Sequence, residues 1–372
     1  MKIISSIPFR NPYQVLLVKK DKKFPMKYIK PWICAFIIII LNHFILKGQD
    51  QAGAFIKAGA ADANKLGKAY LNPLMNGFGV GFSQGWASRA DVRAGHVDIK
   101  FLGGLSFIPI SEQIFDANQL GLSSMVKVNG AGISPTVSGL NQAGAALDLY
   151  ETNPITGQPQ KISSLNSPSG TGYNFIPIAV PQVSVGLPFG TGISVRAIPN
   201  LTIGNASLGV YGGSLIHDIS SHFPIIPLHF GILAGFTQVN LQYGLKVQPD
   251  PGASTNPQSD YSHQKLNLKS NSLTLGFIVS KTFAILTLHG GINYNHSTGL
   301  LTATGTYPIT TYGLSGNPQT TDIKDPINIQ GDQLSYLSAS AGIQLKLGFF
   351  SILAEGTTGH YTSVNGGIGL SF

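Results

Sequence analysis

Cysteine is nearly absent from this 372-residue sequence, in which Cys34 is the only one. Cys34 lies at the start of an apolar leader, whereas a lipid-modified cysteine would follow the apolar run, so we expect no lipid anchor. If the leader is removed, the exported part has neither a disulfide nor a thiolate available to it. Its stability must therefore come from a packed core or from a membrane.

An excess of positive charge is also missing from most of the chain. The net charge is +8, but residues 1–48 alone contain nine Lys or Arg and one acid, which accounts for all of it. Beyond residue 48, basic and acidic residues balance. A neutral body excludes the basic surface that nucleic-acid binding needs, so we expect no nucleic-acid partner.

The leader has the order of a secretory signal peptide: basic MKYIK at 26–30, apolar WICAFIIIILNHFIL at 32–46, then KGQDQ. An apolar run of about fifteen residues is shorter than the roughly twenty that a membrane-spanning helix needs. We therefore expect 26–48 to be a signal peptide cleaved near Gly48, and 1–25 to be an upstream extension. An uncleaved membrane anchor is the alternative.

Catalytic and metal-binding motifs are missing as well. The sequence contains no Gly-x-Ser-x-Gly, His-Glu-x-x-His, phosphate-loop or dinucleotide motif, and the glycines of GFGVGFSQG follow the spacing of a strand. His217, Asp218 and His222 of HDISSH have no further ligand nearby, so we expect no metal and no cofactor. We expect a protein that is not an enzyme; a barrel hydrolase that brings a Ser and a His together is the alternative.

Apolar residues that alternate with small or polar ones are abundant. Clear examples are 77–86, 238–247, 286–295, 337–347 and 363–372, and a period of two predicts a strand with one apolar face. Shorter examples occur at 97–101, 183–189, 193–197, 208–216 and 273–279. About eleven strands are evident on this criterion.

Apolar and polar residues also alternate in the strands of a soluble sandwich, but strand length and connection length favour a membrane barrel. A tilted membrane strand needs about nine to eleven residues, whereas soluble strands average about five or six. The connections are short at 189–191, 280–282 and Gly348 but long at 248–264 and 297–333. Short turns at one rim and long loops at the other are typical of outer-membrane barrels.

We therefore predict an all-β fold, a transmembrane antiparallel β-barrel of about twelve strands within a range of roughly 10 to 14. Closed bacterial barrels have an even number of strands. We accordingly expect one more strand in 110–174, near 122–128.

The last strand ends in GGIGLSF, with Ile368, Leu370 and Phe372 on one face. This pattern resembles the insertion signal of Gram-negative outer-membrane proteins. The resemblance implies an outer-membrane location, with the barrel-assembly machinery and outer-membrane lipid as partners.

The phrase DANKLGKAYLNPLMNGFGVGFSQGW, residues 62–86, resembles an uncharacterised family of Bacteroidetes outer-membrane barrels. Asn72-Pro73 within it is similar to the Asn-Pro-Ala motif of the long-chain fatty-acid transporter family, although Leu74 stands in place of the alanine.

Residues 50–71 are rich in Ala, Lys and Leu and predict a helix that Asn72-Pro73 would end. We accordingly divide the exported chain into a helical segment, 49–76, and a barrel, 77–372. The helix is either a plug of the barrel, because the glycines of the first strand would permit close approach, or a periplasmic lead-in.

If the apolar face of each strand meets lipid, the other face lines the lumen. The candidates for lumen-lining residues are His96, Asp98, Lys100, Arg196, His289, Gln344, Lys346 and Glu355. Their mixed charges either pair across a packed interior or line a wet pore.

This architecture predicts a passive channel or transporter for a small solute, hydrophobic solutes included. The alternative is a structural or surface-interaction barrel that transports nothing and acts through its long external loops, 110–174, 248–264 and 297–333.

Overall fold

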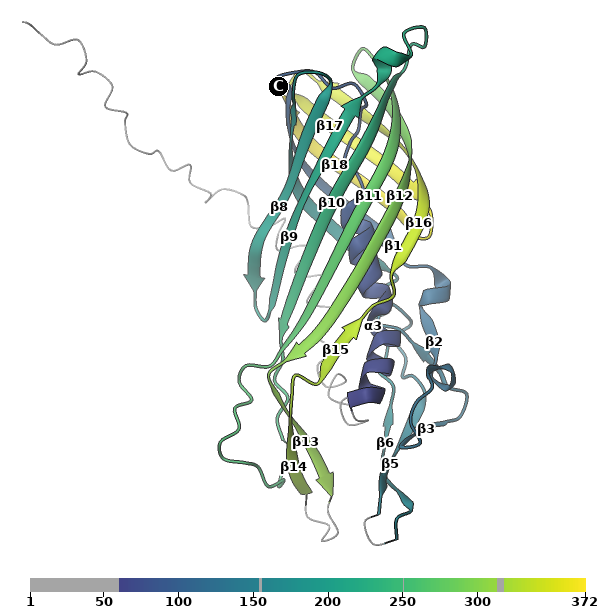
Figure 1. Cartoon of the computed structure of the whole chain (residues 1–372), viewed down its shortest axis with the longest axis vertical. Coiled ribbons are helices and arrows are strands. Elements are labelled where there is room, and N and C mark those ends of the chain that lie inside the picture. Colours follow the sequence, from purple (N-terminus) through teal and green to yellow (C-terminus); the bar gives the residue numbers. More distant parts are fainter. Residues whose placement is uncertain (1–59, 154–155, 250, 313–317) are drawn as a thin grey trace, which may run out of the picture. The chain divides into compact units, whose positions relative to one another are not determined.

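The computed structural model describes residues 60–372, except 154–155, 250 and 313–317. The expected signal peptide and the first part of the expected helix lie outside these residues. Ten strands of the described chain form a closed antiparallel barrel (Figure 1). They are β1 (Val97–Phe107), β7 (Phe175–Gly186), β8 (Thr191–Ile203), β9 (Ala206–Asp218), β10 (His229–Gly244), β11 (Lys265–Phe283), β12 (Leu286–Thr304), β16 (Leu334–Leu347), β17 (Phe350–Thr358) and β18 (Thr362–Ser371).

Barrel strands that follow one another in the chain are neighbours in the wall. The order runs from β11 through β10, β9, β8, β7, β1, β18, β17 and β16 to β12, and the pairing of β11 with β12 closes the ring. The first and last strands meet in the register Ile99↔Leu370. The all-β barrel that the alternating pattern predicts is therefore confirmed, with ten strands, the lower end of the expected range.

The barrel has two different rims. One, the turn end, contains the connections 187–190, 219–228, 284–285 and 348–349, together with the C-terminal Phe372. The other, the loop end, contains the long connections 108–174, 245–264 and 305–333 and two short ones, 204–205 and 359–361. The turn predicted at 280–282 lies a few residues too early, because β11 continues to Phe283.

The predicted first strand is wrong: 77–86 is not part of the wall. A single helix, α3 (Ala60–Ser83), runs through Asn72-Pro73 and the glycine repeat. The expected domain boundary at residue 77 consequently falls inside this helix. Without this segment, ten of the eleven evident strands remain. Ten is an even number, so the barrel closes without the extra strand expected in 110–174.

Residues 110–174 contribute nothing to the barrel wall and form separate small sheets at the loop end. These consist of β2 (Ile114–Asp116) with β4 (Ile133–Pro135), and of β3 (Val126–Asn129) with β5 (Ala146–Thr152) and β6 (Pro159–Asn166), with the short helices η2 (Ile110–Glu112) and η3 (Ala117–Leu120). The expected strand near 122–128 is real as β3, but it pairs with β5. Its apolar side chains pack on the first half of α3.

The loop after β12 is structured too. It contains the hairpin of β13 (Thr306–Tyr312) and β14 (Pro318–Lys324), followed by β15 (Ile327–Gln330), which pairs with β12 beyond the start of β16. At the turn end, η4 (Ser220–His222) lies between β9 and β10. Among the described residues, no helix is long and apolar enough to cross a membrane.

The apolar face of a strand does not always meet lipid. On β10, Ile232 and Phe236 point outward and are exposed, but Val239, Leu241 and Tyr243 are buried in the interior. The expectation that the apolar set of 238–247 faces lipid is therefore wrong. The physical reason is length: β10 has 16 residues and β11 and β12 have 19 each, more than the roughly nine to eleven that cross a bilayer. Where a strand extends beyond the bilayer, its outer face meets water and can be polar, while its inner face can be apolar.

Candidate functional site: the barrel interior

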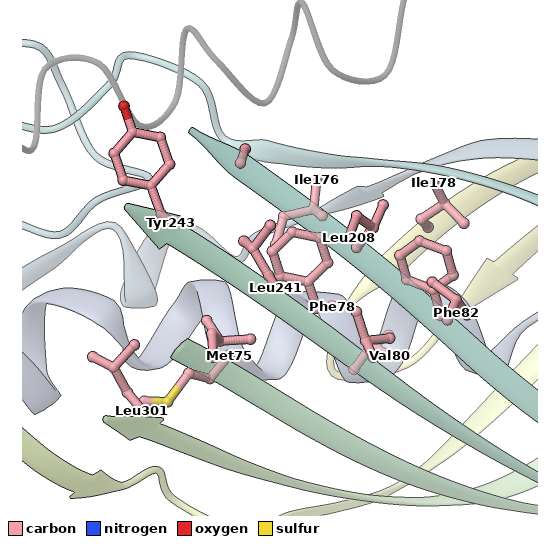
Figure 2. Packing of buried hydrophobic residues seen from close by; sticks show 14 of the residues in the cluster. Met75, Phe78, Val80, Phe82, Ile176, Ile178, Leu208, Leu241, Tyr243 and Leu301 are labelled. Atoms are coloured by element: carbon pink, nitrogen blue, oxygen red, sulfur yellow. The ribbon is translucent and has the colours of Figure 1, made fainter. Parts of the chain in front are cut away.

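The second half of α3 fills the loop-end half of the barrel interior (Figure 2). Phe78 and Phe82, four residues apart, stack at a centroid distance of 6.3 Å on one side of the helix. Met75, Val80 and these rings form one buried cluster with wall residues of β7, β9, β10 and β12. Because the wall surrounds the helix, no face of this segment needs to be polar, and its sequence therefore lacks the polar stripe that would distinguish a helix from a strand.

Glycine makes this fit possible. A Cβ at Gly77 or Gly81 would clash with the end of the Ile176 or Ile178 side chain of β7. On the opposite side, a Cβ at Gly79 would clash with Ser297 Oγ and lie 2.8 Å from Ser270 Oγ. The three glycines therefore let the backbone of α3 approach the wall on two sides at once.

Wall side chains bind the last carbonyls of α3, which have no partners within the helix. Arg196 Nη1 of β8 donates to Phe82 O at 2.8 Å, and Thr237 Oγ1 of β10 donates to the same oxygen at 3.2 Å. Thr274 Oγ1 of β11 donates to Ser83 O at 3.4 Å. The helix is thus capped at its C-terminus by three different strands.

Arg196 is 1% exposed, although it carries a charge in the interior. Its Cζ lies 3.8 Å from the centroid of the Trp86 ring, a cation–π contact, and its Nε donates to Gln182 Oε1 at 2.7 Å. Gln182 Nε2 in turn donates to Trp86 O at 3.0 Å. Arg196 therefore joins β7, the end of α3 and the segment that follows it.

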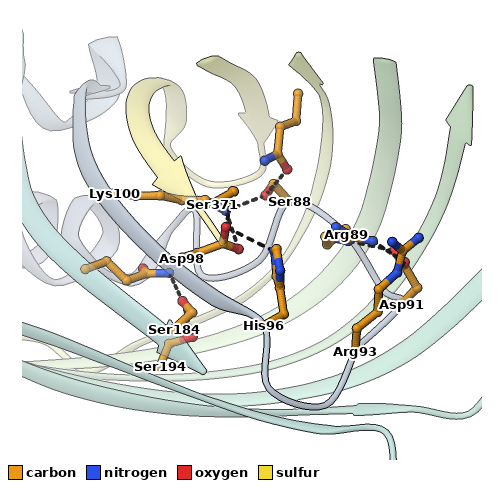
Figure 3. A network of polar contacts seen from close by, with 12 residues as sticks. Ser88, Arg89, Asp91, Arg93, His96, Asp98, Lys100, Ser184, Ser194 and Ser371 are labelled. Atoms are coloured by element: carbon orange, nitrogen blue, oxygen red, sulfur yellow. Dashed lines mark hydrogen bonds and ion pairs between the residues drawn. The ribbon is translucent and has the colours of Figure 1, made fainter. Parts of the chain in front are cut away.

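The segment 84–96 leads from α3 to β1 and closes the turn end with a polar network (Figure 3). Asp98 pairs with His96 at 3.4 Å and with Lys100 at 3.5 Å, and it accepts a hydrogen bond from Ser371. Lys100 Nζ donates to Ser88 Oγ at 2.9 Å, and Ser88 Oγ donates to Gln344 Oε1 at 2.7 Å. The network therefore ties the segment to β1, β16 and β18.

Arg89 and Asp91 form a second ion pair on the same segment. Arg89 Nε donates to Asp91 Oδ1 at 2.8 Å, and Arg93 Nε lies 3.4 Å from Asp91 Oδ2. Burial by itself would raise the pKa of Asp91, but the hydrogen bonds and charge of Arg89 outweigh it and hold the pKa below its ordinary value. A carboxylate with a depressed pKa stabilises the folded state above its ordinary pKa, and this contribution is lost as the pH falls through the depressed value.

We expect acid to loosen this segment. Below about pH 4, protonation of Asp91 removes the charge that holds Arg89, and the emission of nearby Trp86 should shift. In an Asp91→Asn variant, this part of the pH response should disappear. Asp260→Asn is the matched control, because Asp260 also has a depressed pKa but lies in an exposed loop at the loop end. A response that is the same with and without Asp91 would contradict the assignment.

The structure places the eight predicted lumen residues in three groups. His96, Asp98, Lys100 and Gln344 belong to the turn-end network, with Lys346 half-buried at the same end of β16. His289 and Glu355 form a separate buried pair, with Nε2 and Oε2 3.1 Å apart. Arg196 holds the end of α3. The interior that these residues line is occupied by side chains and by the helix.

The predicted insertion signal lies on the outer face of the wall. Ile368, Leu370 and Phe372 are exposed on β18 or directly after it. Phe372 N donates to Val97 O at 2.9 Å, and Phe372 O accepts from Val97 N. The C-terminus is therefore part of the seam between the first and last strands.

The first half of α3 is tied to the loops rather than to the wall. Lys68 Nζ lies 2.7 Å from Asp332 Oδ1, and Asn72 exchanges two hydrogen bonds with Asp332. An open groove of about 440 Å³ lies beside these residues, bounded also by Glu112. Glu112 accepts hydrogen bonds from Tyr361 and His360, and burial together with this carboxylate raises the pKa of Tyr361.

Sequence reasoning missed the residues of 84–96, above all Trp86, Ser88, Arg89 and Asp91. The available signal was the run WASRADVR, in which three charges follow the glycine repeat directly. The HDISSH residues have local roles: His217 Nδ1 contacts Thr191 Oγ1 at 3.0 Å, and Asp218 accepts from Ser220 N at 2.8 Å. In the described part of the chain, no three His, Cys, Asp or Glu side chains gather as metal ligands would.

A closed antiparallel barrel with an apolar outer band and a C-terminal strand at the seam defines an outer-membrane β-barrel protein. Residues 26–372 match the family model described as "Family of unknown function (DUF6588)". The chain belongs to this family. Among curated proteins, none matches the sequence.

Solved structures of outer-membrane proteins resemble the chain at low identity. Ail, the attachment invasion locus protein of Yersinia pestis, is 9% identical, with coverage of 75% of this chain and 100% of Ail and a TM-score of 0.24. The outer membrane protease OmpT of Escherichia coli is 10% identical, with coverage of 78% and 99% and a TM-score of 0.25. The Pseudomonas putida toluene transporter TodX is 8% identical, with coverage of 76% and 91% and a TM-score of 0.27. Such likeness says nothing about activity.

Proposed function

We propose that this protein is a passive outer-membrane transporter for a small apolar solute, and that α3 is its movable plug. The observation that carries the proposal is the inverted polarity of the interior. Ile176, Ile178, Leu208, Val210 and Leu241 point inward at the loop-end half. Water-filled barrels have polar interiors, so a chamber with apolar walls is suited to an apolar solute.

The sequence of α3 supports its role as a plug that moves. Pro73 removes a backbone hydrogen bond in mid-helix and is about 3 kcal/mol less favourable there than Ala, and each of Gly77, Gly79 and Gly81 costs up to about 1 kcal/mol. The helix is therefore weak by itself and depends on the barrel for its stability. Removal of such a helix from its seat exposes the apolar chamber without breaking a wall strand.

The orientation of the barrel follows from its rims. Outer-membrane barrels have short periplasmic turns and longer external loops, so the loop end faces the exterior and the turn end faces the periplasm. The solute would then reach the chamber from the exterior, beside the first half of α3. The Bacteroidetes origin, the cleaved signal peptide and the kinship with fatty-acid transporters remain predictions, and we propose a role without catalysis.

The test is transfer of an apolar fluorescent dye across liposomes that contain the folded protein, with α3 free or locked. A Cβ at Gly81 would lie 3.3 Å from Ser106 Cβ on β1, close to the roughly 3.5–4.5 Å of a disulfide. The same Cβ would meet the end of the Ile178 side chain, so the variants are made in an Ile178→Ala background. We expect a Gly81→Cys/Ser106→Cys variant in this background to lose dye transfer when oxidised and to regain it on reduction. The chain has no cysteine after residue 48 that could interfere.

The two single-cysteine variants are the matched controls and should transfer dye under both conditions. Folding is checked by the heat-dependent shift in gel mobility that a closed barrel gives. A folded, unlocked protein that transfers neither dye nor ions would refute the proposed function. Equal transfer by the locked and unlocked forms would refute the role of α3.

The alternative, a surface-interaction barrel, is favoured by a different observation. Two small sheets, β2–β4 and β3–β5–β6, form a structured unit at the loop end instead of loose loops. Deletion of residues 310–320, the outer part of the β13–β14 hairpin, distinguishes the two functions, because it leaves in place Tyr307, which is buried in the same cluster as Met75 and Phe78. Lost adhesion to a surface with unchanged dye transfer would support the interaction role.

A further inference from the structure

One seam of the barrel wall is paired over only part of its length. β7 and β8 have 12 and 13 residues, yet their register runs only from Gln182↔Arg196 to Gly186↔Gly192. On its other side, β7 pairs with β1 along almost its whole length, from Val97↔Val185 to Phe107↔Phe175. Residues 175–181 of β7 and 197–203 of β8 therefore lie beyond this register and form no ladder with each other.

The hydrogen-bond directions show which residues of β7 face the unpaired seam. Gly186 exchanges hydrogen bonds with Gly95 and His96, and Asn174 O accepts from Ile108 N, so even-numbered residues bond toward β1. Leu187 N donates to Thr191 O, so odd-numbered residues of both strands bond toward the seam. Backbone groups alternate in this way along any antiparallel strand.

All the prolines of the two strands fall on the seam side. Pro177 and Pro181 of β7 and Pro199 of β8 are odd-numbered, and proline has no N–H to leave unpaired. Pro199 lies within a shift of the register between β8 and β9, from Ile198 to Leu201, which bends β8 at this position. An unpaired N–H in a membrane costs several kcal/mol, so these prolines lower the cost of an open seam.

The seam joins the apolar chamber to the apolar outer face. Outward positions beside it are Val183 and Pro181 on β7 and Val195 and Ala197 on β8, all exposed. Ala179, at the next outward position of β7, is only 6% exposed and belongs to the same cluster as Ile176 and Ile178 of the interior. Apolar side chains thus continue from inside to outside.

We propose that the unpaired β7–β8 seam is a lateral portal through which an apolar solute passes between the chamber and the outer part of the lipid bilayer. The occupant we commit to is a small apolar molecule, not a strand of another protein. Strand addition needs a continuous row of N–H donors on the receiving edge, and Pro177 and Pro181 interrupt that row on β7. This inference rests on the proposed transport function and specifies its route.

The test is a staple across the seam. Pro181 and Ala197 occupy the first register position beyond the last pair, and both are exposed outward. In a Pro181→Cys/Ala197→Cys variant, a short bis-maleimide should abolish transfer of the apolar dye into liposomes, to the rate of protein-free vesicles. The same variant without the staple should transfer dye as the unmodified protein does.

The matched control is a staple across a fully paired seam. Ala234 and Leu275 are opposite each other on the outer faces of β10 and β11, and an Ala234→Cys/Leu275→Cys variant with the same reagent should retain transfer. Equal transfer by both stapled variants would overturn the portal while the transport function stands. Loss of transfer in both would overturn the specific role of the seam. Absence of transfer in the unmodified folded protein would remove the proposed function itself.

Discussion

Replacement of Gly79 by valine is expected to expel α3 from the barrel while the wall remains closed. Ser297 and Ser270, which a side chain at this position would meet, lie on β12 and β11 and have no room to retreat. Overpacking in a close-packed interior typically costs about 1–3 kcal/mol, and α3 is the weaker partner because the wall strands hold one another. We expect the helix, not the sheet, to give way.

Accessibility of the interior measures this effect. Ser272 points inward from β11 and is 2% exposed, so a Ser272→Cys reporter should be inert toward a water-soluble maleimide in the parent and reactive in the Gly79→Val variant. The heat-dependent gel shift should persist in both. A variant whose reporter stays inert, or whose barrel no longer folds, would contradict the expected result.

Gly67→Ala is the matched control in the same helix. A Cβ there would meet only the flexible end of Ile329, at 2.9 Å. Alanine is about 1 kcal/mol more favourable than glycine in a helix, so this change should seat α3 at least as firmly as before. The two substitutions are thus expected to act in opposite directions although each adds a side chain to a helical glycine.

Replacement of Arg196 by alanine is expected to give the largest loss of stability. Hydrogen bonds to charged groups contribute about 1.5–3 kcal/mol each, and Arg196 makes two, to Phe82 O and Gln182 Oε1. Its contact with the Trp86 ring is lost too. We expect a cost of about 3 kcal/mol or more, because buried oxygens are left with fewer donors.

Two measurements report this loss. The temperature at which the folded gel band disappears should fall. In a Trp32→Phe background, in which Trp86 is the only tryptophan, the fluorescence emission of Trp86 should shift as its ring becomes more exposed to water. Arg196→Lys should be intermediate, since lysine keeps the charge but has neither the planar stack nor the fork of donors.

Arg93→Ala supplies the comparison for an arginine at the surface. The Arg93 side chain is 70% exposed and makes only a long contact with Asp91, so both readouts should change little. If Arg196→Ala behaves like Arg93→Ala, the role assigned to Arg196 in holding the end of α3 is wrong.

The sequence alone determined the class of fold, because a period of two is a local property of the backbone. The alternation at 286–295 and 337–347 and the row ending in Phe372 each place their outward residues correctly. The contrast between tight turns and long loops was also visible, since loop length is read directly from the spacing of strands.

Only the tertiary structure decided what lies inside the barrel. The repeat of Gly77, Gly79 and Gly81 fits a strand and a helix equally well in one dimension, and the choice depends on a wall that surrounds it on all sides. The side chains of Val239 and Leu241 point into the barrel because the part of β10 that contains them lies beyond the bilayer. Likewise, only the strand pairing shows that Pro177, Pro181 and Pro199 lie along the same seam, because residues far apart in the chain become neighbours only through the fold.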